Sequence, residues 1–297
     1  MKPLLFNISI YLYLLLCASN NAHCQQSDSI NEKPYKYRII FSASLFLNVK
    51  DEDVAAITKV LTKELIKEQN SGDDFEIIFC HSINDINKAL EQEFDILWIS
   101  QIEKEQINKK YKLEPELINE VNGTYGDVYY LITNKNENRN DLCSLKNCSI
   151  NIFSKADGLN PSLWLEYLLR KDNFPGKKKF FSKINFDYKA NNIVLPVYFN
   201  KTNAAVITKS AYNLLCELNP SIKKELAVID SSKPLVNGIF YSDPRNKNEK
   251  KKRSMFNYLK NLQKGSYSQQ MKDMYKLERV VPFKPEYLNT FWEVYKK

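Results

Sequence analysis

Residue types that carry covalent chemistry are scarce in this chain of 297 residues. It has two histidines, His23 and His81, and His81 directly follows Cys80. Neighbouring side chains on a strand point to opposite faces, so Cys80 and His81 cannot act together as nucleophile and base there. A single histidine beyond residue 24 cannot build a Ser-His-Asp triad or a histidine-rich metal site. We therefore expect a protein that is not an enzyme and that needs no metal or cofactor.

Polar side chains that could bind a small molecule follow two hydrophobic segments. Ser42 and Ser44 come after the predicted strand 37–41, while Ser100 and Gln101 lie at the end of a strand predicted at 95–100. Open α/β sheets bind ligands outside the carboxyl ends of their strands. We therefore predict that these four residues contact a ligand. The alternative is that they are ordinary loop residues.

A second polar group precedes a predicted helix. Asp157, Gly158 and Asn160 come before a helical pattern from Pro161 to about residue 171, with Asn160 predicted as N-cap and Pro161 as the first helical residue. Helix N-termini offer unpaired N–H groups and a partial positive charge, which suit an anion. The prediction is a ligand-binding turn, and the alternative is simple helix capping.

The elements that must position these residues alternate between strands and helices. The predicted strands are 37–41, 75–79, 95–100, 126–133, 149–153, 180–186, 204–207 and 226–229. The predicted helices are 51–68, a helix opened by a capping box of Ser82 and Asp85, 161–171, 191–199, 209–217, 247–262 and 282–297. This order predicts α/β units with mostly parallel sheets covered by helices.

The N-terminus is typical of an exported protein. Lys2 precedes an apolar run at residues 4–17, and small residues at 22 and 24 would allow cleavage before Gln25. We predict a signal peptide at 1–24, a disordered segment at 25–35, and a periplasmic or secreted mature protein. A membrane anchor and a lipidated cysteine are the alternatives.

Four cysteines follow the predicted signal peptide, and Cys143 and Cys148 are near neighbours. In an oxidising compartment they could form a local disulfide, although two packed thiols remain the alternative. The net charge of +8 is scattered, which argues against nucleic-acid binding. Only 7 glycines occur, and no phosphate-binding glycine motif is present. The basic run 247–253 is predicted as a solvated helix face, with transporter or anionic-lipid docking as the alternative.

Three segments in order resemble the phosphonate-binding family of periplasmic ABC-transporter proteins. Residues 194–219 contain Leu-Pro-Val, Asn-Ala-Ala-Val and Leu-Asn, which is similar to that family's helix, short strand and following helix. The Asp-Ile-Leu-Trp-Ile-Ser strand at 95–100 resembles a second family segment, and Pro282-Phe283 followed by Tyr287 resembles the closing one. The resemblance covers roughly residues 36–295.

The resemblance implies a two-lobed type II periplasmic binding fold. Residues 36–123 and 233–297 would form the first lobe, and residues 124–232 the second. Two crossing strands, near Gly123–Asp127 and Ser231–Asn237, would form a hinge. The ligand would bind between the lobes, which would close on it.

This chain departs from the family where the phosphonate would bind. The family's Ser-Thr-Ser-Gly turn is replaced by Lys-Ala-Asp-Gly at 155–158, which places the Asp157 carboxylate near an expected anion. Ile83 replaces a family tyrosine, and Asn191 lies where the family has an aspartate, with Lys189 beside it. By this alignment Lys189 and Asn191 are further ligand-binding candidates. The ligand could be a phosphonate-like oxyanion, or a neutral or cationic molecule.

The expected function is therefore that of a monomeric solute-binding component of an ABC importer, with a permease as its partner. Tyr125, at the predicted hinge, could stack on the ligand or pack between the lobes. A sensory module that docks on a membrane receptor kinase is the first alternative. An enzyme on the same fold is the second.

Overall fold

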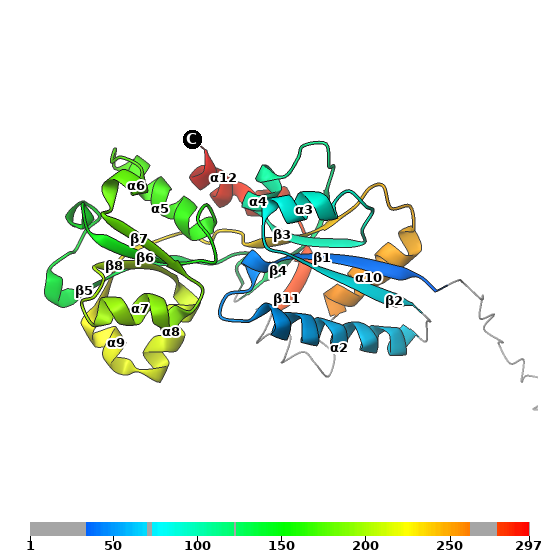
Figure 1. The fold of residues 1–297 in the computed structure, drawn as a ribbon, viewed down its shortest axis with the longest axis horizontal. Helices are drawn as coiled ribbons and strands as arrows, with labels where there is room; N and C mark the ends of the chain where they lie inside the picture. Colours follow the sequence, from blue (N-terminus) through cyan, green and yellow to red (C-terminus); the bar gives the residue numbers. More distant parts are fainter. Residues whose placement is uncertain (1–33, 70–72, 122, 262–277, 297) are drawn as a thin grey trace, which may run out of the picture. The chain divides into compact units, whose positions relative to one another are not determined.

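The computed structural model describes residues 34–69, 73–121, 123–261 and 278–296 (Figure 1). Residues 36–297 belong to one compact unit. The predicted signal peptide and nearly all of the predicted disordered segment lie outside the described residues. None of the helices in the described ranges has the length and apolar character that a membrane crossing requires.

The first sheet has six strands in the order β11-β4-β10-β3-β1-β2. These strands are β1 (Lys36–Ser42), β2 (Asp74–Cys80), β3 (Ile96–Ser100), β4 (Glu114–Glu120), β10 (Gly238–Ser242) and β11 (Arg279–Pro282). β1 pairs in parallel with β2 and β3, whereas β10 and β4 pair antiparallel to their neighbours. The sheet therefore joins the N-terminal part of the chain with its C-terminal part.

The second sheet has five strands in the order β7-β6-β8-β5-β9. They are β5 (Tyr129–Asn134), β6 (Ser149–Phe153), β7 (Lys183–Asp187), β8 (Ala204–Thr208) and β9 (Leu226–Ser231). β6 is parallel to β7 and β8, while β5 is antiparallel to β8 and β9. The α/β prediction is confirmed, but the sheets are mixed rather than mostly parallel. The reason is that β5 and β10, the strands that enter each sheet from the other, run against their neighbours.

Helices cover both faces of each sheet (Figure 1). The α-helices are α2 (Asp51–Gln69), α3 (Ile83–Ala89), α4 (Gln101–Gln106), α5 (Asn160–Lys171), α6 (Lys177–Phe180), α7 (Ala190–Tyr198), α8 (Lys209–Leu218), α9 (Pro220–Glu225), α10 (Glu249–Asn261) and α12 (Asn289–Tyr295). Four 3-10 helices are also described, η1 (Ala43–Leu45), η2 (Lys135–Glu137), η3 (Cys143–Leu145) and η5 (Pro285–Leu288).

The cores follow from strand alternation. In the first sheet, Leu97 joins one apolar cluster with Ile86 and Phe291, whereas the next residue, Trp98, stacks on Phe240 on the other face at 4.7 Å. In the second sheet, one face packs on α5 and α6, and the opposite face packs on α7 and α8. Each sheet thus has apolar residues on both faces, as fully buried strands require.

The two segments that cross between the sheets pair with each other. Asp127 and Leu235 exchange two backbone hydrogen bonds of 2.9 Å. Gly126 lies so close to the Leu235 carbonyl that an added Cβ would overlap it. The C-terminal segment also reaches both cores, because Phe291 packs in the first sheet's cluster and Val294 in the second's.

Several predicted boundaries are wrong for local reasons. The predicted strand 180–186 is shorter, since α6 ends at Phe180 and β7 begins at Lys183. The predicted helix 282–297 divides into the end of β11, η5 and α12, because Pro285 interrupts regular helical hydrogen bonding. The sequence patterns also missed β4, β10 and β11, whose lengths are seven, five and four residues.

Candidate functional site

The predicted serines of the first sheet converge on one carboxylate, that of Glu103. Ser42 Oγ lies 2.5 Å from Glu103 Oε1, and Ser100 Oγ lies 2.7 Å from Glu103 Oε2. The Ser100 backbone N–H donates to the same Oε2 at 2.9 Å, completing a capping box at the start of α4. Glu103 is 6% exposed. The two serines therefore already hydrogen-bond an oxygen anion that belongs to the protein.

The two other predicted residues of this sheet are also engaged. Ser44 Oγ lies 2.8 Å from Ser42 Oγ, and the buried Gln101 side chain accepts a 2.8 Å hydrogen bond from the Tyr241 hydroxyl. Gln101 Nε2 donates to Glu105 at 2.9 Å. The structure thus brings Ser42, Ser44 and Ser100 together. Sequence analysis missed Glu103, although Ser100-x-x-Glu103 is a capping-box pattern.

The turn before α5 is held by a lysine from α6. Lys177 Nζ lies 3.0 Å from Asp157 Oδ1 and 3.1 Å from Glu166 Oε1. Burial would raise the pKa of Asp157, but the hydrogen bond and charge of Lys177 outweigh it and lower that pKa. Gly158 has a φ of +80°, the left-handed conformation that favours glycine. The Asp157 charge is therefore balanced from within the second sheet's own helices.

Asn160 does not cap α5, contrary to prediction. The N-cap is Leu159, and no side chain caps this helix end. Asn160 is the first helical residue, is 2% exposed, and donates from Nδ2 to the Val236 carbonyl at 2.8 Å. Its amide is used by the segment that returns to the first sheet, 76 residues away. Sequence-local reasoning could not reveal that partner.

Lys189 and Asn191 lie at the start of α7. Both side chains are exposed, and the Lys189 backbone N–H donates to Asp187 Oδ1 at 2.7 Å. Lys189 Nζ lies 5.9 Å from the centroid of the Tyr188 ring. Both residues flank Ala190, whose backbone N–H bonds Asn48 of the first sheet's loop.

The loop from the first sheet that meets the second is residues 46–51, here called the bridging loop. Leu47 packs against the apolar cluster formed by α7 and α8. Asn48 accepts from the Ala190 backbone N–H through Oδ1 at 3.0 Å and donates its own N–H to the Tyr188 carbonyl at 3.0 Å. Asn48 has a φ of 64°, a conformation that asparagine tolerates better than most residues.

An ion pair extends the same contact. Asp51 Oδ1 lies 2.7 Å from Lys155 Nζ, and Asp51 Oδ2 lies 3.4 Å from His81 Nδ1. The bridging loop therefore supplies two oxygen acceptors, Asn48 Oδ1 and Asp51 Oδ1. They bond the Ala190 N–H and Lys155 Nζ of the second half of the molecule. Sequence analysis identified neither acceptor. The one signal available was the turn-forming character of Asn48, three residues before α2 begins.

Tyr125 packs on a tyrosine. Its ring lies 3.8 Å from that of Tyr287, with an interplanar angle of 19°. A hydrogen bond with Tyr287 raises the pKa of Tyr125. Both rings pack against the apolar cluster of the first sheet, so this contact is not the predicted packing between the lobes, and a contact of Tyr125 with ligand stays a prediction.

Burial makes the Cys80 thiol unsuited to nucleophilic chemistry. Burial, with the charges of Asp85 and Glu103, raises the pKa of Cys80 to about 12. The predicted Cys143–Cys148 disulfide is wrong, because both thiols are free. Cys143 is exposed, whereas Cys148 is buried and accepts from Arg139 Nη1 at 2.9 Å. The described residues also hold no group of three or more His, Cys, Asp or Glu side chains that could bind a metal.

Solved structures with this fold include several binding proteins. PhnD1 from Prochlorococcus marinus, in complex with methylphosphonate, has a TM-score of 0.64 at 16% identity, covering 88% of this chain and 97% of that one. A component of an ABC phosphonate transporter from Pseudomonas aeruginosa has a TM-score of 0.63 at 13% identity, covering 88% and 85%. The aliphatic sulphonate binding protein SsuA from Escherichia coli has a TM-score of 0.55 at 12% identity, covering 88% and 86%.

These structural likenesses confirm the type II periplasmic binding fold. A comparison with curated proteins found no match. The model of one family, described as the periplasmic phosphonate substrate-binding proteins of ABC transporters, matches residues 47–288. That match spans most of the chain, and the chain therefore belongs to this family of periplasmic substrate-binding proteins.

Proposed function

We propose that this protein is the solute-binding component of an ABC importer and that it captures a small oxyanion between its two sheets. The observation that carries the proposal is the bridging loop, whose Asn48 and Asp51 oxygens lie on the Ala190 N–H and on Lys155. An oxyanion offers the same kind of oxygen acceptor to both donors. The N-terminus of α7 adds a favourable partial charge.

The other predicted ligand contacts support this choice by elimination. Ser42 and Ser100 are satisfied by Glu103, and Asp157 is satisfied by Lys177. Turning Ser42 and Ser100 toward a ligand would leave the buried Glu103 carboxylate without these donors, which is costly. Lys155 and the Ala190 N–H can leave the bridging loop for a ligand. The Asp51 carboxylate then still has His81 nearby.

In this proposal, residues 36–123 and 233–297 act as one lobe and residues 124–232 as the other. The paired crossing segments at Asp127 and Leu235 are the hinge. Separation of the lobes would break the bridging-loop contacts and release Lys155 and the Ala190 N–H for ligand. The protein would work as a monomer outside the cytoplasm, after signal-peptide cleavage, and would deliver its ligand to a permease.

Titration calorimetry tests the proposal with methylphosphonate first, followed by phosphite, sulfonates, nucleosides and amines. We expect one oxyanion to bind, and Lys155→Ala to weaken its binding about tenfold or more, the loss of one charge-assisted hydrogen bond. Lys201→Ala removes an exposed lysine of the second sheet and is the matched control. Binding of amines alone, or equal affinity in both variants, would contradict the proposal.

A further inference from the structure

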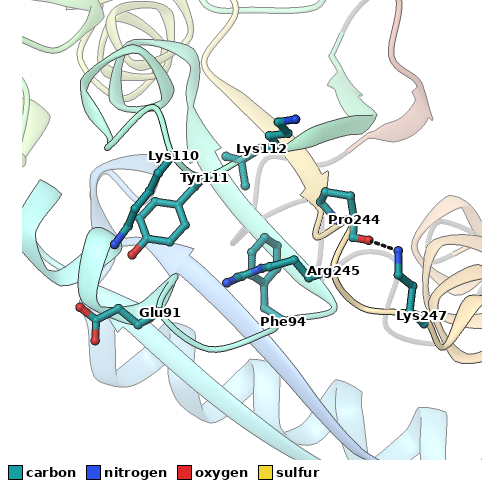
Figure 2. Close-up of a pocket in the computed structure, with 9 residues that line it drawn as sticks. Glu91, Phe94, Lys110, Tyr111, Lys112, Pro244, Arg245 and Lys247 are labelled. Carbon is teal, nitrogen blue, oxygen red and sulfur yellow. Dashed lines mark hydrogen bonds between the residues drawn. The ribbon is translucent and has the colours of Figure 1, made fainter.

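A groove lies at the ends of strands β3, β4 and β10 that are opposite the strand ends carrying Ser42 and Ser100. It has a volume of about 790 Å³ and is formed by segments 91–94, 110–113 and 244–247. These segments precede β3, precede β4 and follow β10, which runs antiparallel to β3 and β4. Figure 2 shows Tyr111 and Arg245 as side chains of opposite walls, with Phe94 close to Arg245.

One wall of the groove is rigidly built. The Arg245 guanidinium donates to both oxygens of the buried Asp243, at 2.8–3.1 Å, and to the Leu90 carbonyl at 2.9 Å. Asn246 is buried and donates to Asp95 at 2.9 Å. Bidentate pairing fixes the guanidinium plane. The side chains of this wall therefore lose little conformational entropy when a partner binds.

The groove is lined by three exposed lysines. Lys110, Lys112 and Lys247 are exposed, and within the described ranges no ion pair joins any of them to a carboxylate. Lys247 Nζ instead donates to the Pro244 carbonyl at 3.0 Å, which Figure 2 shows as a dashed line. Glu91 is the one carboxylate in the lining. The groove is therefore positively charged overall.

The arrangement of the cations selects among anionic partners. In Figure 2, Lys110 lies on the Tyr111 side and Lys247 on the far side, beside Pro244. Cations spread along a groove fit an extended chain of negative charges better than one compact anion. A membrane is flat and cannot enter a concave surface. Stacking of nucleic-acid bases is disfavoured, because Lys110 Nζ and Arg245 Cζ lie 4.8 Å and 5.9 Å from the Tyr111 ring centroid.

We propose that this groove binds an extended acidic peptide segment of a partner protein. Glutamate or aspartate side chains of the segment pair with Lys110, Lys112 and Lys247, and an apolar side chain contacts Leu113 and the Tyr111 ring edge. Because the groove lies at the strand ends away from Ser42 and Ser100, the partner can bind while the candidate ligand site stays accessible. The inference is independent of the ligand proposed above.

Fluorescence anisotropy with a labelled peptide of glutamates around one phenylalanine tests the proposal. We expect the double variant Lys110→Glu, Lys247→Glu to bind this probe at least about tenfold more weakly than the unmodified protein. The matched control is Lys201→Glu, Lys209→Glu, which reverses two exposed lysines of the second sheet and should stay within about twofold. Thermal unfolding of both variants checks that each is folded.

Three outcomes would overturn the proposal. The first is equal binding of the peptide by the two double variants. The second is inorganic phosphate displacing the peptide at the same concentration as an unlabelled copy of it, which would indicate a site for a compact anion. The third is binding to phosphatidylglycerol vesicles that depends on Lys110 and Lys247, in a protein that does not bind the peptide.

Discussion

The two halves of the candidate site satisfy their polar groups in different ways. In the first sheet, Ser42 and Ser100 bond Glu103, a residue of the same sheet's first helical turn after β3. In the second sheet, Lys155 and the Ala190 N–H bond oxygens that come from the other sheet. Polar groups whose hydrogen-bond partners belong to the same sheet have a structural role. Polar groups whose partners come from the other sheet can exchange those partners when the sheets separate. The predicted serines belong to the first kind.

The largest expected effect comes from removing the internal partner. Glu103→Ala leaves the Ser100 N–H and hydroxyl without their acceptor, while Ser42 keeps only Ser44 Oγ. We expect the free energy of unfolding to fall by about 3 kcal/mol. Urea denaturation measures this loss. Glu105→Ala, on the same helix but with a more exposed carboxylate, should lose less than about 1 kcal/mol. Equal losses would remove the distinction between the two kinds of contact.

A smaller loss is expected when a partner across the sheets is removed. Lys155→Met leaves Asp51 close to His81, so we expect the free energy of unfolding to fall by about 1 kcal/mol. The measurement is again urea denaturation, with Lys189→Met as the control, because Lys189 is exposed beside the same contact. A loss as large as that of Glu103→Ala would mean that Lys155 is structural.

Asn48→Gly tests the side-chain oxygen alone, because glycine keeps the positive φ of 64° without strain. We expect a loss of about 0.5 kcal/mol in the free energy of unfolding, typical of a helix cap replaced by glycine. Asn138→Gly, at a φ of 52°, is the matched substitution without a described contact to the other sheet. If chemical denaturation gives the same change in the free energy of unfolding for Asn48→Gly and Asn138→Gly, the Asn48 amide does not contribute to stability.

The smallest effect concerns pH. Because the folded-state pKa of Asp157 lies below its ordinary value of 3.8, its pairing with Lys177 stabilises the fold above that value. This contribution is lost as pH falls through the lowered pKa, and solvent screening keeps it under about 0.5 kcal/mol. Lys177→Met should flatten the acid limb of stability, whereas the exposed Lys178→Met should not. An unchanged acid limb in both would contradict the pairing.

How far the sequence predicts this molecule depends on the separation of the interacting residues. The strand 149–153 was predicted with its observed bounds, because its apolar pattern is local. Ser82 caps α3 as predicted, and Asp85 accepts from the His81 N–H as well. Contacts between distant residues, such as Ser42 with Glu103 and Asn160 with Val236, leave no local pattern.

The basic run 247–253 shows the same limit. The sequence predicted a solvated helix face, but Lys251 pairs with the buried Asp73 at 2.6 Å and Lys252 pairs with Glu249 at 2.8 Å. The first of these partners is 178 residues away. Lys247 and Arg253 are exposed as predicted. Only the fold distinguishes the paired lysines of this run from the solvated ones.

The most direct test of the central claim compares Asp51→Ala with Lys155→Ala in calorimetric titrations of methylphosphonate. If the bridging loop competes with an oxyanion for the same donors, Asp51→Ala should bind the oxyanion more tightly and Lys155→Ala more weakly, by about tenfold between the two variants. A parallel weakening in both variants, or no change in either, would show that the loop oxygens do not stand where the ligand binds.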